Sequence, residues 1–338
     1  MDDRNFTPAW WLPGPHLQTV GARFLRLLDG VVSERERIEL DDGDFVDLDW
    51  AVEVGGTSPA PGAPLVLVMH GLEGSSRSEY VLEMQRALAR VGLASAALNF
   101  RSCSGEPNRL PRFYHAGDTR DPATVLDLLR ARFPDRPLGA VGFSLGGNVL
   151  LKYLGERGRD SADHAAVSAA VAISPPFDLA TGVVTVERGL SRGYQRYLLR
   201  KLQRKVRAKS VMLRDHVDVT ALLAARTIRE FDELGTAPLS GFRDWSDYYV
   251  RASSKQFLPD IRRPTLVIRA LDDPFLNAEA VPPGELTANP LIEGVFPLSG
   301  GHVGFVGGSP WAPVFWAERT AARYLAEKLA GCASGHAI

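Results

Sequence analysis

A serine stands between two glycines in Gly142-Phe143-Ser144-Leu145-Gly146, a spacing typical of a catalytic nucleophile. The apolar run over residues 138–141 predicts a short buried strand, and apolar residues at helical spacing follow over residues 145–154. A sharp turn between a strand and a helix can hold a serine hydroxyl in a strained backbone, exposed at the carboxyl end of a sheet. Although the motif alone is a weak signal, this setting favours a nucleophile over an idle serine in a glycine-rich loop.

A serine hydroxyl near neutral pH needs a base to accept its proton, and the base needs an acid to orient it. Of the seven histidines, His302 alone lies after the last predicted strand and before the closing helix, between small residues that leave its imidazole accessible. We predict that it is the base. The acid is Asp272 or Asp273, which share one turn after a predicted strand. We prefer Asp273, because Pro274 sets a bend that can aim its carboxylate across the strand ends.

The oxyanion of such a reaction needs backbone N–H donors where the negative charge develops. One donor is expected from Leu145, the residue after the serine, and the other from Leu72 in the loop over residues 70–74. In that loop His70 is expected to shape the turn. No metal or organic cofactor is needed for this chemistry.

Other polar residues follow a second strand, over residues 99–106 and 114–118. We expect Arg101, Glu106 and Asp118 to brace the loops of the site by ion pairs. Cys103 is expected to be a buried, inert thiol.

The elements that must position these residues follow a regular order. Residues 35–54 alternate around a turn at 41–44 and predict a hairpin. Short apolar runs then alternate with helical patterns: the predicted strands are residues 65–69, 93–98, 138–141, 167–173, 265–270 and 291–298, and a closing helix covers about 311–330. This alternation predicts an α/β protein with a mostly parallel sheet and helices on both faces. The alternation stops between residues 177 and 260, so we expect a core in two parts (residues 1–176 and 261–338) around a helical lid insertion (residues 177–260).

The proline- and aromatic-rich residues 6–18 cannot form one helix. Pro15 can open a helix that runs through Val20, Phe24 and Leu28, and we expect this segment to be a strap packed on the core.

Composition bounds the class of protein. The 338 residues are 45% hydrophobic and 23% charged with a net charge of −1, which gives no overall attraction to nucleic acid. The two cysteines, Cys103 and Cys332, have no metal-binding or redox spacing. No secretory signal follows the acidic start, and the longest apolar run, around residues 165–173, is too short to span a bilayer. We therefore expect a cytoplasmic protein.

The expected lid carries a basic segment. Residues 188–214 contain ten Lys or Arg and no Asp or Glu, and Arg188, Arg192, Arg196, Arg200 and Arg204 recur every four residues beside an apolar row of Leu190, Tyr194, Leu198 and Leu202. One interpretation is a lid that contacts anionic lipid. We favour the other, a solvated helix face paired with acidic neighbours.

Several motifs extend the pattern over about residues 6–325, and the longest are Pro15-His16-Leu17-Gln18-Thr19, residues 70–74, 99–105, 114–117, 272–275 and 300–305. With them the chain resembles the YheT-type α/β hydrolases, which are related to eukaryotic lipid-acting α/β-hydrolase-domain proteins. The resemblance implies the α/β-hydrolase fold, with Ser144 as nucleophile, Asp273 as acid and His302 as base. It also implies hydrolysis of carboxylic esters, with acyl-lipid substrates suspected.

We therefore predict a serine hydrolase that cleaves esters of short- to medium-chain acyl groups or acylglycerol-like substrates through an acyl-enzyme. Five aromatic residues of the insertion are candidates to line the substrate pocket: Phe177, Phe242, Trp245, Tyr248 and Phe257. Two alternatives stay open, namely an acyltransferase on the same triad and a scaffold that binds an acyl ligand without turnover.

Overall fold

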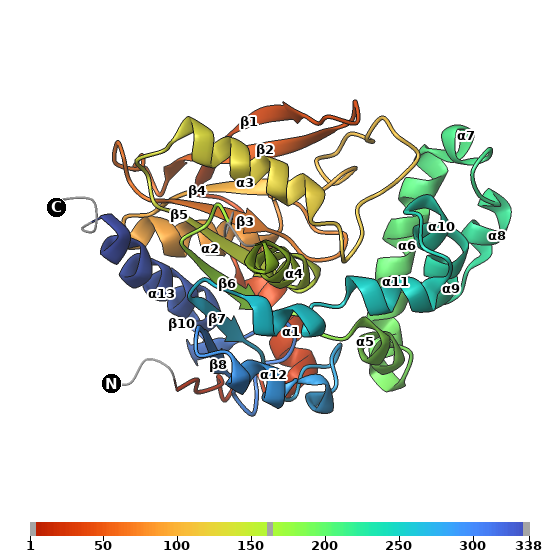
Figure 1. The fold of residues 1–338 in the computed structure, drawn as a ribbon. Coiled ribbons are helices and arrows are strands. Elements are labelled where there is room, and N and C mark those ends of the chain that lie inside the picture. The colour runs from red at the N-terminus through yellow and green to blue at the C-terminus, as the bar shows by residue number, and fades with distance from the viewer. Residues whose placement is uncertain (1–4, 161–164, 334–338) are drawn as a thin grey trace.

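The computed structural model describes residues 5–160 and 165–333 of the 338-residue chain. Its centre is an eight-stranded sheet with the order β1-β2-β4-β3-β5-β6-β7-β8 (Figure 1). The strands are β1 (Val31–Glu39), β2 (Phe45–Val54), β3 (Leu65–Met69), β4 (Ala94–Asn99), β5 (Leu138–Phe143), β6 (Ala169–Ile173), β7 (Thr265–Ile268) and β8 (Ile292–Val295). β2 pairs antiparallel with both β1 and β4, and the strands from β4 to β8 are parallel to their neighbours. The predicted mostly parallel sheet is confirmed.

Helices cover both faces of the sheet, as its side chains require. In β3, Leu65, Leu67 and Met69 join one apolar cluster and Val66 and Val68 join another, because successive side chains of a strand point to opposite faces. α3 (Arg120–Arg132) and α4 (Leu145–Arg159) pack on the first cluster, and α2 (Glu79–Arg90) and α13 (Trp316–Ala333) pack on the second. Figure 1 shows these helices on either side of the sheet.

A group of helices between β6 and β7 lies on the right of Figure 1, and we call it the cap. It contains α5 (Leu179–Val186), α6 (Arg192–Ala208), α7 (Ser210–Leu213), α8 (Val219–Ala224), α9 (Ile228–Phe231), α10 (Ala237–Leu239) and α11 (Trp245–Ala252). Three short helical turns of other types complete the segment between β6 and β7: η1 (Gly189–Ser191), η2 (Asp232–Thr236) and η3 (Lys255–Asp260). Outside the cap, η4 (Ala278–Ala280) and α12 (Pro283–Ala288) follow β7. The cap has a small apolar cluster of its own, which includes Leu199, Val206 and Leu222.

The basic face of α6 differs from the expectation. Arg192, Arg196, Arg200 and Arg204 are exposed, as a solvated face requires. However, none of these four side chains forms an ion pair with an acidic group in the part of the chain that the structure describes. The physical reason is that α6 carries no acidic residue and no acidic side chain of a neighbouring element reaches this face.

The two ends of the described chain meet beside the sheet. Helix α1 (Pro15–Leu25) lies against a hairpin of β9 (Val306–Ser309) and β10 (Ala312–Phe315), which the sequence did not predict. The Gln18 side chain accepts a hydrogen bond from the Val306 amide (2.8 Å) and donates one to the Val306 carbonyl (3.1 Å). The closing helix therefore begins at Trp316 and not near residue 311, since residues 312–315 pair as a strand.

No helix in the described ranges has the length and apolar character that crossing a membrane requires.

Two glycines let α4 lie directly on the chain after the cap. A Cβ at Gly155 would stand 2.3 Å from the Phe257 carbonyl oxygen, and one at Gly158 would stand 1.8 Å from the Asp260 carbonyl oxygen. Neither gap can hold a methyl group without a backbone shift.

Gly155→Ala should therefore destabilise the protein by about 1–3 kcal/mol, measured by urea unfolding. Gly193→Ala, in α6 with open space around its Cβ position, is the matched control. It should be neutral or stabilising by up to about 1 kcal/mol, because alanine is the better helix former. Equal stability of the Gly155→Ala protein and the wild type would contradict the packing argument.

Candidate active site

Ser144 occupies a strained turn between β5 and α4. Its φ of 49° and ψ of −118° are unfavourable for a residue with a side chain, and its amide donates a hydrogen bond to the Ile173 carbonyl (2.8 Å). A Cβ at Gly142 would stand 2.3 Å from the Gly146 carbonyl oxygen, and a Cβ at Gly146 would stand 2.6 Å from the His70 carbonyl oxygen. Glycine is required at both positions because the turn brings backbone against backbone.

Three side chains that are distant in the sequence meet at this turn. His302 Nε2 lies 2.9 Å from Ser144 Oγ, and His302 Nδ1 lies 2.7 Å from Asp273 Oδ2. Since a carboxylate accepts, Nδ1 carries the proton and Nε2 is left to accept the serine proton. The Asp273 side chain is fully buried and the His302 side chain is 10% exposed. This is the arrangement that activates a serine hydroxyl.

The neighbouring aspartates make different contacts. Asp273 Oδ1 accepts a hydrogen bond from the Phe275 amide (2.8 Å), which fixes the carboxylate that faces His302. Asp272 Oδ1 instead accepts from the Gly301 amide (2.9 Å), so Asp272 holds the backbone of the histidine loop. Burial raises the pKa of Asp272 above its ordinary value.

Helix α1 holds the other side of the histidine loop, a role that the sequence reasoning missed. Thr19 Oγ1 accepts a hydrogen bond from the His302 amide (2.9 Å). Arg26, just beyond the helix, donates to the carbonyls of Val303 (2.7 Å) and Gly304 (3.2 Å). A Cβ at Gly301 would stand 2.5 Å from the Pro15 carbonyl oxygen. The motif over residues 15–19 was the available signal, since it contributed to the family resemblance without an assigned task.

The loop after β3 lies against the serine. A Cβ at Gly71 would stand 3.1 Å from the Ser144 Cβ, so the two segments touch. Leu72 and Leu145 both line the cavity that contains Ser144. Among the described residues, no acceptor is hydrogen-bonded to the amide of either leucine. Both N–H groups are thus free to bind an oxygen of a ligand.

His70 takes part in the turn and not in the triad. Its buried ring accepts a hydrogen bond from the Phe100 amide at Nε2 (3.2 Å) and therefore donates through Nδ1 to the Gly71 carbonyl (2.7 Å). Burial lowers the pKa of His70 to about 3, so the ring is neutral.

A buried ion pair joins the same loop to the cap. Glu73 has a positive φ of 56°, and its amide donates to the Tyr114 hydroxyl (2.7 Å). Its carboxylate accepts from Tyr114 (3.0 Å) and pairs with Lys205 of α6 (2.8 Å). Lys201, one turn earlier, donates to the Glu73 carbonyl (2.9 Å). Helix α6 therefore fixes the residue that follows Leu72.

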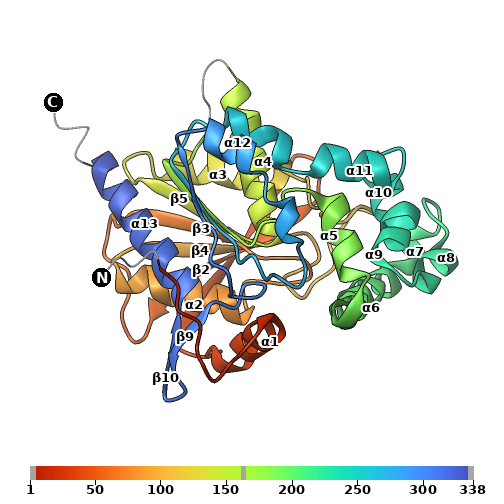
Figure 2. The same cartoon turned by 90° about the horizontal axis from the view of Figure 1, so that it is seen from below.

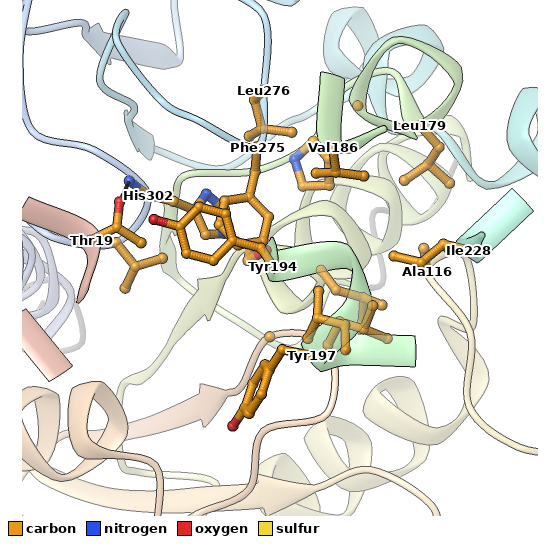
Figure 3. A pocket seen from close by; sticks show the side chains of 18 of the residues that line it. Thr19, Ala116, Leu179, Val186, Tyr194, Tyr197, Ile228, Phe275, Leu276 and His302 are labelled. Carbon is orange, nitrogen blue, oxygen red and sulfur yellow. Dashed lines mark hydrogen bonds between the residues drawn. The ribbon is translucent and has the colours of Figure 1, made fainter. Parts of the chain in front are cut away.

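An aromatic column covers the imidazole of His302 (Figure 3). The Phe275 ring stacks on His302 with centroids 4.2 Å apart, and Tyr194 of α6 stacks on Phe275 at 4.7 Å. The Tyr194 hydroxyl in turn lies 3.1 Å from His16 Nδ1 of α1. The column thus joins the cap, the triad and the N-terminal helix.

A mostly apolar cavity of about 400 Å³ opens above Ser144 and His302. Residues of α1, α5, α6, α9 and α11 and of the loops after β3 and β7 are among those that form its wall. They include Val20, Phe24, Leu179, Val186, Leu198, Leu202, Ile228, Tyr248, Tyr249, Phe275 and Leu276. One end lies at the exposed residues of α1, and the other lies under the cap, where Tyr249 donates to Asp232 (2.7 Å). Burial raises the pKa of Asp232 to about 6.

Of the five aromatic residues predicted to line the pocket, Tyr248 does so. The prediction is wrong for the other four. Phe242 and Trp245 lie behind the lining, where their rings pack on Tyr248 (5.1 Å) and Tyr249 (5.5 Å). Phe177 is fully buried in the core, and Phe257 packs under Lys152 and Arg159.

Three of the four residues in the apolar row of the basic segment, Tyr194, Leu198 and Leu202, do line the cavity. That row was the signal that the prediction did not use.

The remaining polar residues support the frame of the site. Arg101 pairs with Asp44 (2.8 Å) and Asp121 (2.6 Å), and Glu106 pairs with Arg37 (2.7 Å). Asp118 pairs with Arg112 and lies 3.8 Å from Arg120. Burial raises the pKa of the Cys103 thiol, which lies 3.0 Å from Lys205 Nζ. The described residues contain no group of three or more His, Cys, Asp or Glu that could hold a metal ion.

The fold and the site define the class of protein. Residues 64–308 match the family described as "alpha/beta hydrolase fold", and the chain belongs to that family. An esterase of Pyrococcus furiosus, Pf2001, has the same fold, with a TM-score of 0.56 over 96% of this chain and 99% of its own at 16% identity.

The chain is also similar in sequence to several named proteins. The chain is 40% identical over 318 residues to the Escherichia coli K12 protein named "Putative esterase YheT", which covers 93% of this chain and 91% of the relative. It is 30% identical over 307 residues to mouse "Phospholipase ABHD3" (90% and 74% covered). It is 31% identical over 274 residues to the Saccharomyces cerevisiae "Monoacylglycerol lipase" (79% and 58% covered). The resemblance to YheT-type α/β hydrolases is confirmed.

The two aspartates give a direct test of the site. Asp273→Asn should lower kcat for p-nitrophenyl ester hydrolysis by about 10³- to 10⁴-fold, because the amide stabilises the wrong tautomer of His302. Asp272→Asn keeps an oxygen for the Gly301 amide and should change kcat by less than about tenfold. The reverse order of effects would assign the acid to Asp272.

Proposed function

We propose that this protein hydrolyses carboxylic esters through an acyl-enzyme on Ser144. The observation that carries the proposal is the pair of contacts of His302, 2.9 Å to Ser144 Oγ and 2.7 Å to Asp273 Oδ2, at the floor of an apolar cavity. The names of the relatives, an esterase, a lipase and a phospholipase, support the same class of reaction.

The reaction follows from the contacts. His302 Nε2 takes the proton of Ser144 as Oγ attacks the ester carbonyl, and the amides of Leu72 and Leu145 hold the resulting oxyanion. The C–O bond to the alcohol breaks as His302 returns the proton to the leaving oxygen. Water then gives its proton to the same imidazole and attacks the acyl-enzyme. The acid is released and Ser144 regains its proton.

The cavity favours an acyl chain as the bound group. Its cap end is formed by buried side chains, including Ile228, Tyr248 and Tyr249, which offer apolar surface and exclude water. Its other end is open at α1, where the alcohol part of the ester can leave. We therefore place the acyl chain under the cap, as expected for short- to medium-chain or acylglycerol-like esters.

Replacement of the nucleophile tests the proposal. Ser144→Ala should lower hydrolysis of p-nitrophenyl butyrate on the order of 10³-fold or more and abolish labelling by a fluorophosphonate probe. Ser309→Ala, at an exposed serine of β9, is the control and should keep both signals. Unchanged turnover by the Ser144→Ala protein would overturn the proposal. Labelling of Ser144 without product would indicate a scaffold, and ester exchange with added alcohols in place of acid release would indicate an acyltransferase.

A bulky residue in the cavity tests the acyl chain. Leu198→Trp should lower kcat/KM for p-nitrophenyl octanoate about tenfold more than for the acetate, because the added ring removes space for several methylenes. Leu190→Trp, in the same apolar row but exposed and outside the cavity, should leave the ratio unchanged. An equal effect of Leu198→Trp on both esters would place the acyl chain elsewhere.

A further inference from the structure

Helix α1 exposes large apolar side chains that an ordinary surface helix would bury against the core. Its buried residues are Gln18 and Ala22, one polar and one small. Leu17, Val20 and Phe24 are exposed and share one face, because they are spaced three and four residues apart. Leu27 and Leu28 continue this exposed surface after the helix ends. We call these five residues the apolar ridge. Packing against the core does not explain them, since they face away from it.

The apolar ridge stands at the mouth of the catalytic cavity. Val20 and Phe24 line that cavity together with Ser144 and His302, although Phe24 is 80% exposed. The outer end of the cavity therefore opens beside the largest exposed side chain of α1. A solvent-exposed apolar surface that rims a site marks a place where the protein contacts another apolar phase.

Two exposed tryptophans lie on the segments next to α1. Trp10, 81% exposed, precedes α1, and Trp311, 89% exposed, occupies the turn of the β9–β10 hairpin. The neighbouring Trp11 donates a hydrogen bond to the Gly308 carbonyl (3.0 Å), which joins the N-terminal segment to that hairpin. Figure 2 shows α1 and the hairpin along the same edge of the molecule. Tryptophan is enriched where a protein meets the interfacial zone of a bilayer.

Positive charge lies next to the apolar ridge. Helix α6 contacts α1 through Tyr194, 3.1 Å from His16, and through Tyr197, whose ring lies under Arg23 at 5.3 Å. The outward face of α6 carries Arg192, Arg196, Arg200 and Arg204, which we call the arginine row. As described above, its members make no ion pair with any described residue. Four guanidinium groups are thus available to an external anion.

We propose that the apolar ridge and the arginine row together dock the mouth of the cavity onto an anionic phospholipid surface. The ridge side chains enter the zone between headgroups and acyl chains, and the arginine row binds lipid phosphates. Docking itself does not depend on the proposed ester hydrolysis. The consequence for a substrate does rest on it: a lipid ester can enter the cavity from the bilayer without crossing water.

The positive charge of this face favours an anionic bilayer over a second copy of the chain as its binding partner. Residues 188–214 contain ten basic and no acidic residues, so two copies joined at this surface would bring like charges together. The net charge of the whole chain is −1, so the attraction is local to this face. At its surface, an anionic bilayer offers both an apolar interior to the apolar ridge and lipid phosphates to the arginine row.

Vesicle sedimentation of the full-length protein tests the proposal. We expect binding to vesicles of equimolar phosphatidylcholine and phosphatidylglycerol that weakens as salt is added, because salt screens the arginine row. Leu17→Asp with Leu28→Asp should lower the affinity about tenfold or more. Asp at position 17 lies in the first turn of α1, where a negative charge suits the helix. Arg196→Glu with Arg200→Glu should lower affinity for the anionic vesicles by about tenfold or more and leave binding to phosphatidylcholine alone unchanged.

Matched changes on other faces are the controls. Val250→Asp on α11 and Arg130→Glu on α3 also alter exposed residues and should bind as the wild type does. Each variant should keep the wild-type melting temperature and its hydrolysis of soluble p-nitrophenyl acetate. Ser144→Ala protein should sediment like the wild type, which separates docking from turnover.

Three outcomes would overturn the proposal. In the first, the wild type stays in the supernatant with both kinds of vesicle at low salt. In the second, the Leu17→Asp, Leu28→Asp protein binds anionic vesicles as tightly as the wild type. In the third, light scattering shows a dimer that these two changes dissociate, which would identify a second copy as the occupant of the apolar ridge.

Discussion

The orientation of one imidazole ring is the constraint on which the site depends. His302 must present Nε2 to Ser144 while Nδ1 faces Asp273, and three further contacts fix the ring and its backbone: the Phe275 face, Thr19 Oγ1 and, through Val303, Arg26. These groups come from the first and the last quarter of the chain. The arrangement of Ser144, Asp273 and His302 therefore depends on contacts between the two ends of the chain, and α1 positions the candidate site as the strands do.

Backbone strain gathers around the same ring. Glu73, Ser144, Ser174 and Val303 all have positive φ, which costs on the order of 1–3 kcal/mol for each residue. Each of the four amides donates a hydrogen bond: Ser144 to the Ile173 carbonyl, Glu73 to Tyr114 Oη, Val303 to Ser174 Oγ and Ser174 to the Ile268 carbonyl. The strain is thus offset by buried polar contacts at the floor of the cavity, whereas its roof is a separate group of helices.

The sequence alone was sufficient to predict the features that depend on local sequence pattern. The strands before Ser144, Asp273 and His302 were visible as short apolar runs, and parallel strands bring their carboxyl ends to one edge. The cavity wall was not predictable in the same way. Phe177 and Phe275 are both aromatic residues next to a loop, and local pattern does not distinguish the first, which is buried in the core, from the second, which stacks on His302. The β9–β10 hairpin was missed because its strands are only four residues long and two of the four residues of β9 are glycine. The exposed face of α1 was missed because its apolar spacing is the same as that of a buried helix.

The contacts between α6 and the loop after β3 link the position of the cap to the loop that carries Leu72. Lys201 and Lys205 sit on α6, whereas Glu73 follows Leu72 directly. If α6 moved away from the core, Glu73 would lose Lys205 at its carboxylate and Lys201 at its backbone carbonyl, and its carboxylate would keep the hydrogen bond from Tyr114. The position of the Leu72 amide, which directly precedes Glu73, would then depend on the position of the cap. In the mechanism proposed above, such a link would couple binding of the oxyanion to closure of the cap over the substrate.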